Sequence, residues 1–313
     1  MSISKTVLVT GGAGFIGSNL CRRLLKENCK VICMDNFYTG SKKNIEDLLE
    51  NQNFELMEHD VTVPFNICAD EIYHLAAPAS PIHYQKDPIY TIKTIVIGTL
   101  NALECARINN SKLLNTSTSE IYGEPLVHPQ NETYRGNVNI NGIRACYDEG
   151  KRCSETLCSD YRRYHKVDTK IVRIFNTYGP FMNKNDGRVV CEFINCILKN
   201  QPIELFGGGV QTRSFCYIDD LLEGLIRMMN SDCPGPVNLG GTDEITISEL
   251  AKIISEVMNK EPVIEYKDMP SDDPTRRKPD ISKAMKELAW KPRINIRTGI
   301  YNTAKYFESI CND

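Results

Sequence analysis

The chain has 313 residues, of which 41% are hydrophobic and 25% are charged, and its formal net charge is −3. This is the composition of an ordinary globular protein, long enough for one large or two modest domains with a real core. The sequence has no long basic run and no stretch of about 18 apolar residues, so it predicts neither a nucleic-acid surface nor a membrane span.

Cysteine usage bears on the cellular compartment. The 13 cysteines are scattered, odd in number and without any Cys-x-x-Cys pair. Most lie in apolar runs, where cysteine packs as a small hydrophobe. We therefore expect reduced thiols, a cytoplasmic protein and no metal site. Met1 stands shortly before the first predicted strand, which also argues against a signal peptide.

The amino-terminal segment has the pattern of a dinucleotide site. An apolar run at 6–10 predicts a buried strand, the glycines that follow have the spacing G-x-x-G-x-x-G, and helical spacing begins at 18–26. Such glycines let the backbone approach a pyrophosphate at the helix amino terminus. A second strand, 31–34, ends in Asp35, about 20 residues past the glycines, where a carboxylate meets the ribose hydroxyls and repels a 2′-phosphate. The segment therefore predicts NAD.

Strand and helix patterns alternate through the rest of the first half. The expected strands are 54–57, 70–77, 111–116 and 167–174, and the expected helices are 89–108 and 144–165. This alternation predicts an α/β fold, a Rossmann-type doubly wound parallel sheet, within an NAD-binding domain of residues 1–176. Ligands bind at the carboxyl ends of the strands in such sheets.

The alternation of strands and helices becomes less regular in the second half, where glycine and proline residues separate short elements. Helices are expected at 190–198, 219–229, 247–258 and 281–288. We interpret 177–313 as mainly a smaller carboxy-terminal lobe that binds substrate, with some later segments returning to the first domain.

Tyr147 and Lys151 lie four residues apart, so on a helix they share one face. An ammonium beside a phenol lowers the phenol's pKa from its usual value near 10, and the phenolate can then take a proton from a sugar hydroxyl while a hydride leaves the carbon. Thr118, at the end of a predicted strand, can hydrogen-bond the same oxygen. Tyr-x-x-x-Lys alone is weak evidence; the dinucleotide pattern upstream gives it weight.

Longer segments resemble the UDP-glucuronate decarboxylases, or UDP-xylose synthases, of the extended short-chain dehydrogenase/reductase superfamily. The resemblance covers essentially the whole chain. The segments that carry it are 74–81, 117–123, 145–152, 173–180, 186–190, 211–215 and 272–280. It implies that NAD oxidises C4 of UDP-glucuronate, that the resulting β-keto acid loses CO2, and that the same cofactor returns the hydride to give UDP-xylose. It also implies a homodimer formed through the two long helices.

Other activities of the superfamily stay open as alternatives. The 4,6-dehydratases have Thr-Asp-Glu at the positions that match 118–120, and the 4-epimerases usually have a small residue at the position that matches 120. This chain has Thr118, Ser119 and Glu120. That combination favours decarboxylation over a 4-epimerase or a 4,6-dehydratase. A decarboxylase that releases the UDP-4-keto-pentose with NADH, or a non-catalytic NAD-binding protein, is also conceivable.

The resemblance implies roles for individual residues. Glu120 is expected to face C5 and the departing carboxylate, and Arg277 to bind that carboxylate or help protonate C5. The expected catalytic residues are Tyr147, Lys151, Thr118, Ser119, Glu120 and Arg277. The expected cofactor-binding residues are Gly11, Gly14, Phe15, Ile16, Gly17, Asp35, Asn36, Phe37, Thr39, Gly40, Asp60, Val61, Leu75, Ala77, Thr94, Thr116, Tyr147, Lys151, Thr177 and Arg188. The expected substrate-binding residues are Lys93, Asn176, Arg188, Gln211, Arg213 and Arg277.

Two segments depart from the family pattern. Residues 139–142 lack the proline that the family usually has just before the tyrosine helix, and Phe181 stands where the family often has an arginine. We expect the first change to make the loop less rigid and the second to remove a charged contact near the site. Tyr84 and Tyr161 are interpreted as packing residues.

Overall fold

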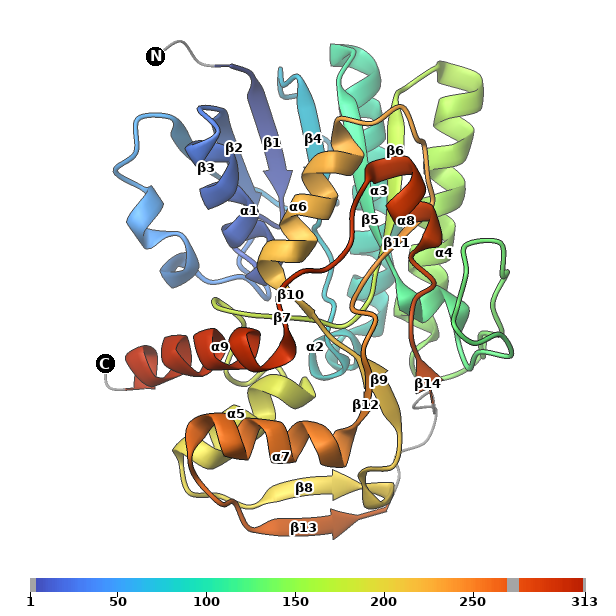
Figure 1. Cartoon of the computed structure of the whole chain (residues 1–313). Helices are drawn as coiled ribbons and strands as arrows, with labels where there is room; N and C mark the ends of the chain where they lie inside the picture. The colour runs from blue at the N-terminus through green and yellow to red at the C-terminus, as the bar shows by residue number, and fades with distance from the viewer. Residues whose placement is uncertain (1–3, 269–275, 312–313) are drawn as a thin grey trace.

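The computed structural model describes residues 4–268 and 276–311 (Figure 1). Part of the segment 272–280 that carries the family resemblance therefore lies outside the described residues. A seven-stranded parallel sheet, in the order β11-β6-β5-β4-β1-β2-β3, forms the centre of the fold. Its strands are β1 (Thr6–Thr10), β2 (Lys30–Asp35), β3 (Phe54–Glu58), β4 (Glu71–His74), β5 (Lys112–Thr118), β6 (Thr169–Ile174) and β11 (Val237–Leu239). The predicted Rossmann-type sheet is confirmed.

Helices cover both faces of this sheet (Figure 1). One face packs against α1 (Phe15–Lys26) and α6 (Ile218–Met229), and the other against α3 (Pro88–Asn109) and α4 (Ala145–Asp160). The alternation within β1 shows why both faces are apolar, since Val7 and Val9 join the core cluster on one side and Leu8 the cluster on the other.

A smaller layer of helices and short strands lies below the carboxyl ends of the large sheet (Figure 1). Its helices are α5 (Val189–Leu198), α7 (Ile247–Met258) and α9 (Ile296–Cys311). It has two two-stranded sheets, β8 (Ile203–Phe206) with β13 (Ile264–Lys267) and β7 (Thr177–Tyr178) with β10 (Cys216–Tyr217). In a three-stranded sheet, β9 (Thr212–Ser214) lies between β12 (Glu244–Thr246) and β14 (Arg276–Arg277). The second half also returns β11, α6 and α8 (Ser282–Leu288) to the large sheet.

Several element boundaries differ from the sequence-based expectation. The first helix begins at Phe15, directly after its N-cap Gly14, three residues earlier than predicted. The α4 helix ends at Asp160, and a π-helical turn continues it to His165. The helices α2 (Pro81–Lys86) and α9 and the short strand β11 were not anticipated.

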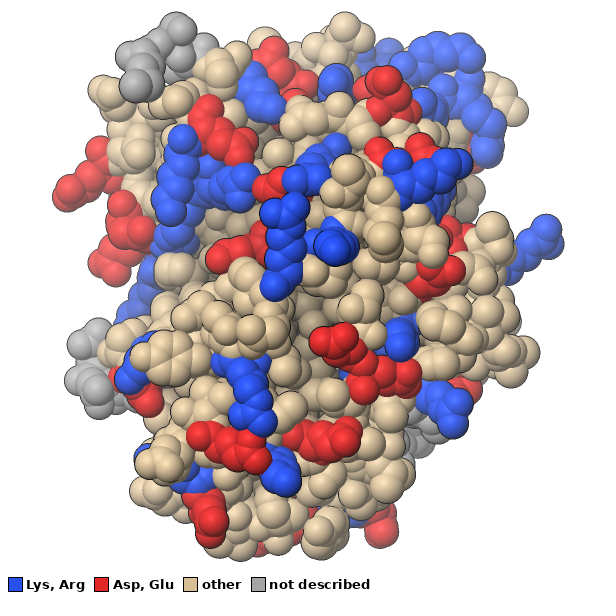
Figure 2. All heavy atoms as spheres, in the orientation of Figure 1, with Lys and Arg blue, Asp and Glu red and all other residues tan. Residues whose placement is uncertain are grey.

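Among the described residues, neither the helices nor the charges on the face drawn in Figure 2 have the features of a membrane span or of a strongly charged binding face. None of the helices in the described part of the chain has both the length and the apolar character needed to cross a bilayer. On the face drawn in Figure 2, acidic and basic side chains are interspersed and do not gather into a patch of one sign.

Candidate active site

A cavity of about 830 Å³ lies at the carboxyl ends of the central strands. Its wall includes Gly11 after β1, Leu75 after β4 and Ser119 after β5, and on the opposite side Arg213 from β9 and Val189 from α5. The cavity therefore lies where a parallel sheet of this kind binds its ligands, between the sheet and the smaller layer.

Most of the predicted site residues line this cavity. They are Gly11, Gly14, Phe15, Ile16, Gly17, Asp35, Asn36, Thr39, Val61, Leu75, Ala77, Thr94, Thr116, Thr118, Ser119, Glu120, Tyr147, Lys151, Asn176, Thr177, Arg188, Gln211, Arg213 and Arg277. The structure does not bring Phe37, Gly40, Asp60 and Lys93 to the cavity wall.

The glycine turn leaves no room for side chains. A Cβ on Gly11, whose φ is +69°, would lie 2.9 Å from the Cα of Ala76, and one on Gly17 would lie 2.2 Å from the carbonyl oxygen of Gly11. The turn, followed by the N-terminus of α1, is therefore a narrow backbone cradle of the kind that holds a pyrophosphate. These residues fit a dinucleotide.

Asp35 closes the far end of this cradle. Its carboxylate accepts hydrogen bonds from the backbone N–H groups of Ala13 at 2.9 Å and Phe37 at 2.8 Å. Burial raises the pKa of this carboxyl, and the backbone hydrogen bonds oppose the rise. The Phe37 N–H therefore holds Asp35, and Gly40 leaves room for the carboxylate, since a Cβ there would lie 2.8 Å from the Asp35 Oδ1. Neither residue lines the cavity.

Asp60 and Lys93 also differ from their predicted places. The Asp60 carboxylate accepts hydrogen bonds from Tyr90 Oη at 2.7 Å and Asn36 Nδ2 at 3.0 Å, and these two partners line the cavity in its stead. Lys93 is exposed on α3, because the buried neighbours Thr91 and Thr94 turn the opposite face of that helix inward.

Tyr147 and Lys151 are both buried on α4, with the Lys151 Nζ 6.0 Å from the centre of the Tyr147 ring. The Nζ donates a hydrogen bond to the Thr116 carbonyl oxygen at 2.7 Å. Burial lowers the pKa of Lys151 to about 8. Burial, reinforced by the Glu120 charge, raises the pKa of the Tyr147 phenol above its usual range, and the Thr118 hydrogen bond lowers it only in part. The lowered phenol pKa expected from the sequence is therefore not seen in the protein alone.

Glu120 is paired with two arginines. The Arg277 Nη1 lies 2.6 Å from the Glu120 Oε1 and its Nη2 lies 3.0 Å from the Oε2, while Arg144 donates to the same Oε2. Burial alone would raise the pKa of the Glu120 carboxyl, but Arg277, Arg144 and then Arg213 outweigh it and hold the pKa below its usual value. Arg144 was missed in the sequence. It lies three residues before Tyr147, one helical turn away, and this spacing could have indicated it.

Tyr84 also lines the cavity, although the sequence suggested packing alone. Its ring stacks on Tyr147 with centroids 5.2 Å apart, and its buried hydroxyl has no hydrogen-bond partner among the described residues. Ser80 Oγ and Gln211 Oε1 are likewise buried, unpartnered there and on the cavity wall. Unpaired buried polar atoms at a cavity surface are suited to bind a ligand. By contrast Tyr161 donates its hydroxyl to Glu104, away from the cavity.

The remaining predicted substrate residues surround this centre. Asn176 Oδ1 accepts from Arg277 Nη1 at 3.5 Å, and Arg213 is buried on β9. Arg188 pairs with Asp186, and its guanidinium lies 5.6 Å from the ring centre of Phe15 beside the glycine turn.

The two departures from the family pattern have local explanations. Residues 139–142 close a turn through the Gly142 N–H, which donates to the Asn139 carbonyl oxygen at 3.0 Å. The Phe181 ring lies 3.8 Å from the guanidinium carbon of Arg22 and packs against Tyr306. An aromatic surface and a neighbouring cation therefore occupy the position of the absent arginine.

Comparison with known proteins identifies the family. The family model described as NAD dependent epimerase/dehydratase matches residues 7–240. UDP-glucuronic acid decarboxylase 1 of Arabidopsis thaliana is 52% identical over 294 residues, which are 94% of this chain and 68% of that protein. The chain belongs to this epimerase/dehydratase family, in its UDP-glucuronic acid decarboxylase group. UDP-glucuronic acid decarboxylase 1 of Danio rerio, another member, is 48% identical over 97% of this chain and 72% of its own length.

Solved structures of this epimerase/dehydratase family share the whole fold. The UDP-glucuronic acid 4-epimerase of Bacillus cereus, in complex with UDP-glucuronic acid and NAD, has a TM-score of 0.87 and 28% identity over 97% of this chain and 99% of its own. A UDP-N-acetylglucosamine 4-epimerase of Methanobrevibacter ruminantium M1 has a TM-score of 0.91 and 26% identity, covering 99% of this chain and 100% of its own.

Within residues 4–268 and 276–311 of this chain, no group of three His, Cys, Asp or Glu side chains could hold a metal ion.

Proposed function

We propose that this chain converts UDP-glucuronate to UDP-xylose and CO2 with NAD as a retained cofactor. The observation that carries the proposal is the Glu120–Arg277 ion pair, which lies in one cavity with the Tyr147 phenol. The pair fits a reaction that releases CO2 from a uronic acid, because its fixed charges can act on the substrate carboxylate. Relatives that are 52% identical and named UDP-glucuronic acid decarboxylase support it.

The first step is proton removal at the C4 hydroxyl. When bound, NAD supplies the two-electron acceptor for C4 and returns the electrons at the end of the cycle. Tyr147 takes the proton, and Thr118 holds the same oxygen. Because burial and the Glu120 charge raise the pKa of Tyr147, its phenolate needs the positive charge of Lys151 nearby.

The second step is the loss of CO2. Oxidation at C4 makes the substrate a β-keto acid, whose bond between C5 and the carboxyl carbon breaks with its electron pair passing to an enolate on O4. Arg277 or Arg144 binds the carboxylate, and the fixed charge of Glu120 disfavours that anion relative to neutral CO2. A proton drawn from solvent is then added at C5 in place of the lost carboxyl group, and Tyr147 returns its own proton to O4.

Residues on the cavity wall divide between the two ligands. The glycine turn and Asp35 would hold the NAD pyrophosphate and adenosine ribose. Asn176, Arg188, Gln211 and Arg213 would hold the UDP-sugar, because an arginine fork grips phosphate with two hydrogen bonds.

A direct assay tests the proposal. Purified protein is incubated with UDP-glucuronate, with and without added NAD, while CO2, NADH and sugar products are followed. UDP-xylose and CO2 without net NADH are expected. CO2 with accumulating NADH would mean that the 4-keto-pentose is released instead, and an epimerised product without CO2 would refute the decarboxylase assignment.

We also propose a homodimer through α3 and α4. These two helices pack side by side, and α3 leaves Ile97, Leu100 and Ile108 exposed to solvent. An unpaired apolar stripe of this kind is typical of a subunit interface. Light scattering should give twice the chain mass, and Leu100→Glu should give the monomer; a monomeric wild-type protein would refute the proposal.

We further propose that the protein is cytoplasmic and that it is divided into a cofactor domain and a substrate lobe. In the described part of the chain the twelve cysteines whose side chains are placed are all unpaired, which supports a reducing compartment. Residues 1–176 carry the dinucleotide cradle and 177–313 supply most of the opposite wall, which supports a cofactor domain and a substrate lobe. Cell fractionation tests the first proposal.

A further inference from the structure

The segment that follows Arg277 is held by a residue from a distant loop. Gln130 lies between Glu120 and Tyr147 in the chain and is only 1% exposed. Its backbone N–H donates to the Lys278 carbonyl oxygen at 2.9 Å, and its Oε1 accepts from the Lys278 N–H at 2.9 Å. Because Lys278 directly follows Arg277, these bonds help to fix the Arg277 backbone, together with its pairing to β9.

A second buried amide joins this segment to the turn that carries Glu120. Asn238 of β11 is fully buried, and its Nδ2 donates to the carbonyl oxygens of Gln130 at 3.0 Å and Asp280 at 3.2 Å. Its Oδ1 accepts from the Tyr122 hydroxyl at 2.8 Å. Tyr122 ends the short helical turn that contains Glu120. The Asn238 side chain therefore links the segment that follows Arg277 to the turn that carries Glu120.

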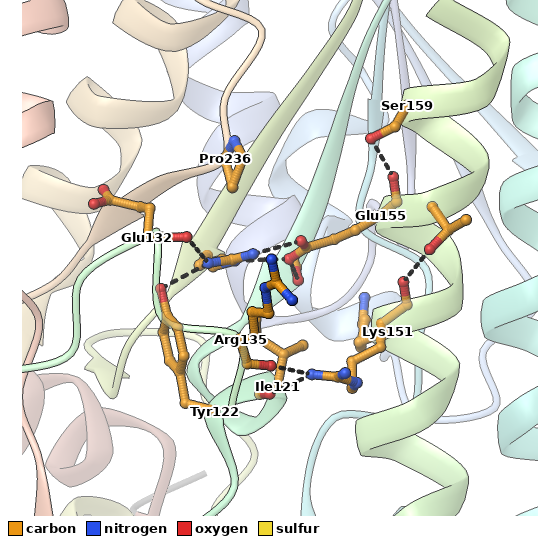
Figure 3. Close-up of polar contacts among 12 residues, drawn as sticks. Ile121, Tyr122, Glu132, Arg135, Lys151, Glu155, Ser159 and Pro236 are labelled. Carbon is orange, nitrogen blue, oxygen red and sulfur yellow. Dashed lines mark hydrogen bonds and ion pairs between the residues drawn. The ribbon is translucent and has the colours of Figure 1, made fainter. Parts of the chain in front are cut away.

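The Tyr122 hydroxyl is fixed from the sheet as well. Arg173 of β6 donates to it at 2.9 Å and to the Glu132 carbonyl oxygen at 3.1 Å, while a bidentate pair with Glu155 at 2.8 and 2.9 Å holds the guanidinium itself (Figure 3). The Asn238 N–H donates to Glu132 Oε1 at 2.8 Å. The supporting network is thus buried at its centre, partly exposed at Glu132 and Glu155, and extends to α4.

We propose that Gln130 and Asn238 are positioning residues for the loss of CO2, because they set the separation of the Glu120 carboxylate and the Arg277 guanidinium. Neither lines the cavity, so they act through the pair and not on the substrate. The oxidation at C4 uses the Tyr147 centre, and it should keep its rate in variants that leave the charges of Glu120 and Arg277 in place, because burial affects the pKa of Tyr147 more than the Glu120 charge does. The inference rests on the proposed decarboxylase function.

Two substitutions disturb the network from opposite sides. Gln130→Met keeps the side-chain length and the backbone bonds, but it removes the acceptor for the Lys278 N–H and the Nε2 donor to the Val127 carbonyl oxygen. Tyr122→Phe removes only the hydroxyl that Asn238 and Arg173 share, and it keeps the ring that packs on Phe175. Should Gln130→Met fail to fold, Tyr122→Phe still decides the question.

The experiment separates the two chemical steps. NAD-loaded protein is mixed with UDP-glucuronate in a single turnover, and bound NADH absorbance and CO2 release are followed together. We expect both variants to form bound NADH at the wild-type rate and to release CO2 about tenfold to hundredfold more slowly, since a misplacement of about 1 Å can cost about a hundredfold in rate. NADH should therefore accumulate transiently.

A matched control distinguishes positioning from general destabilisation. Thr303→Val in α9 also removes a buried hydrogen bond, that from its hydroxyl to the Gly299 carbonyl oxygen at 2.7 Å, but Thr303 does not line the cavity. It should lower the melting temperature and leave both steps unchanged. Equal slowing of both steps in the Tyr122 variant, or no slowing, would overturn the inference. Wild-type protein that releases no CO2 would instead overturn the proposed function.

Discussion

Arg277 grips both carboxylate oxygens of Glu120, at 2.6 and 3.0 Å, although the two residues are 157 positions apart in the chain. In the proposed reaction, this fork would place a fixed negative charge and a fixed positive charge beside the uronate carboxylate. A lysine could supply the charge but not the planar, two-point geometry.

The first prediction concerns the charge of Glu120. Glu120→Gln should lower kcat for CO2 release by about a hundredfold, the size of effect seen when one electrostatic group is removed from an active site. Formation of bound NADH should persist, because Tyr147 and Lys151 are intact. Glu124→Gln, a change in the exposed loop that follows, is the control. Full turnover by Glu120→Gln would contradict the assigned role.

Glu120 should also affect stability at acid pH. Its pKa is lower in the folded protein than in the unfolded chain, so its contribution to stability is present above the unfolded pKa of about 4.3 and is lost as the pH falls through the folded value. In Glu120→Gln this part of the acid destabilisation should disappear. Thermal unfolding between pH 3 and pH 6 measures it, and an acid limb identical to that of the wild type would refute the prediction.

The second prediction concerns Asp148 on α4. Burial, followed by the Glu120 charge, raises the pKa of this carboxyl to about 7, and its Oδ1 has no hydrogen-bond partner among the described residues. Because the folded pKa exceeds the unfolded one, stability should fall as the pH rises from about 4 to 7. Asp148→Asn should melt several degrees higher than the wild type at pH 8 and equally at pH 4.

The control for Asp148→Asn is Asp232→Asn, which removes an exposed carboxylate. Its melting temperature should run parallel to that of the wild type across this pH range. An Asp148→Asn protein that keeps the wild-type pH dependence would show that another group titrates there.

The third prediction concerns Tyr84. Its buried hydroxyl meets the cavity without a partner, so Tyr84→Phe should raise KM for UDP-glucuronate about tenfold, the value of one hydrogen bond, while the melting temperature stays the same or rises. Tyr161→Phe is the matched control, since its hydroxyl bonds Glu104 outside the cavity. That variant should lose stability and keep KM. An unchanged KM with a lower melting temperature for Tyr84→Phe would show instead that Tyr84 only packs in the core.

The fourth prediction concerns cofactor choice. Asp35→Asn should weaken NAD binding about tenfold to a hundredfold, because hydrogen bonds to a charged group contribute about 1.5–3 kcal/mol, and should narrow the preference for NAD over NADP. Calorimetric titration with each nucleotide measures both effects. Asp47→Asn, whose exposed carboxylate pairs with Arg22, should change neither affinity. Unaltered NAD binding by Asp35→Asn would refute the role of the carboxylate.

The sequence predicted elements whose signal is local. The glycine turn and Asp35 lie within one β1–α1–β2 unit, and Tyr147 and Lys151 lie on one helix, where spacing alone determines which face a residue takes. It could not predict Lys93, because the side of α3 that turns inward depends on packing. Nor could it predict the ion pair of Glu120 with Arg144 and Arg277, which needs three segments brought together in space.

The same distinction explains the missed strand. The three residues of β11 are too few to show a period, and they join the sheet because the edge of β6 is open to them. The raised phenol pKa of Tyr147 was missed for a similar reason. It arises from burial and from Glu120, neither of which is visible in the spacing of Tyr147 and Lys151.

The position of β11 and of Arg277 late in the chain has a consequence during synthesis on the ribosome. When the first 176 residues have emerged, the segments of the nucleotide cradle and of the tyrosine helix have been synthesised, but β11, α6 and Arg277 have not. The edge of β6 is covered when Val237–Leu239 arrive, and the ion pair forms only after Arg277 has left the exit tunnel. The two partners of this ion pair are therefore separated in time as well as in sequence, and the pair is among the last contacts that synthesis permits.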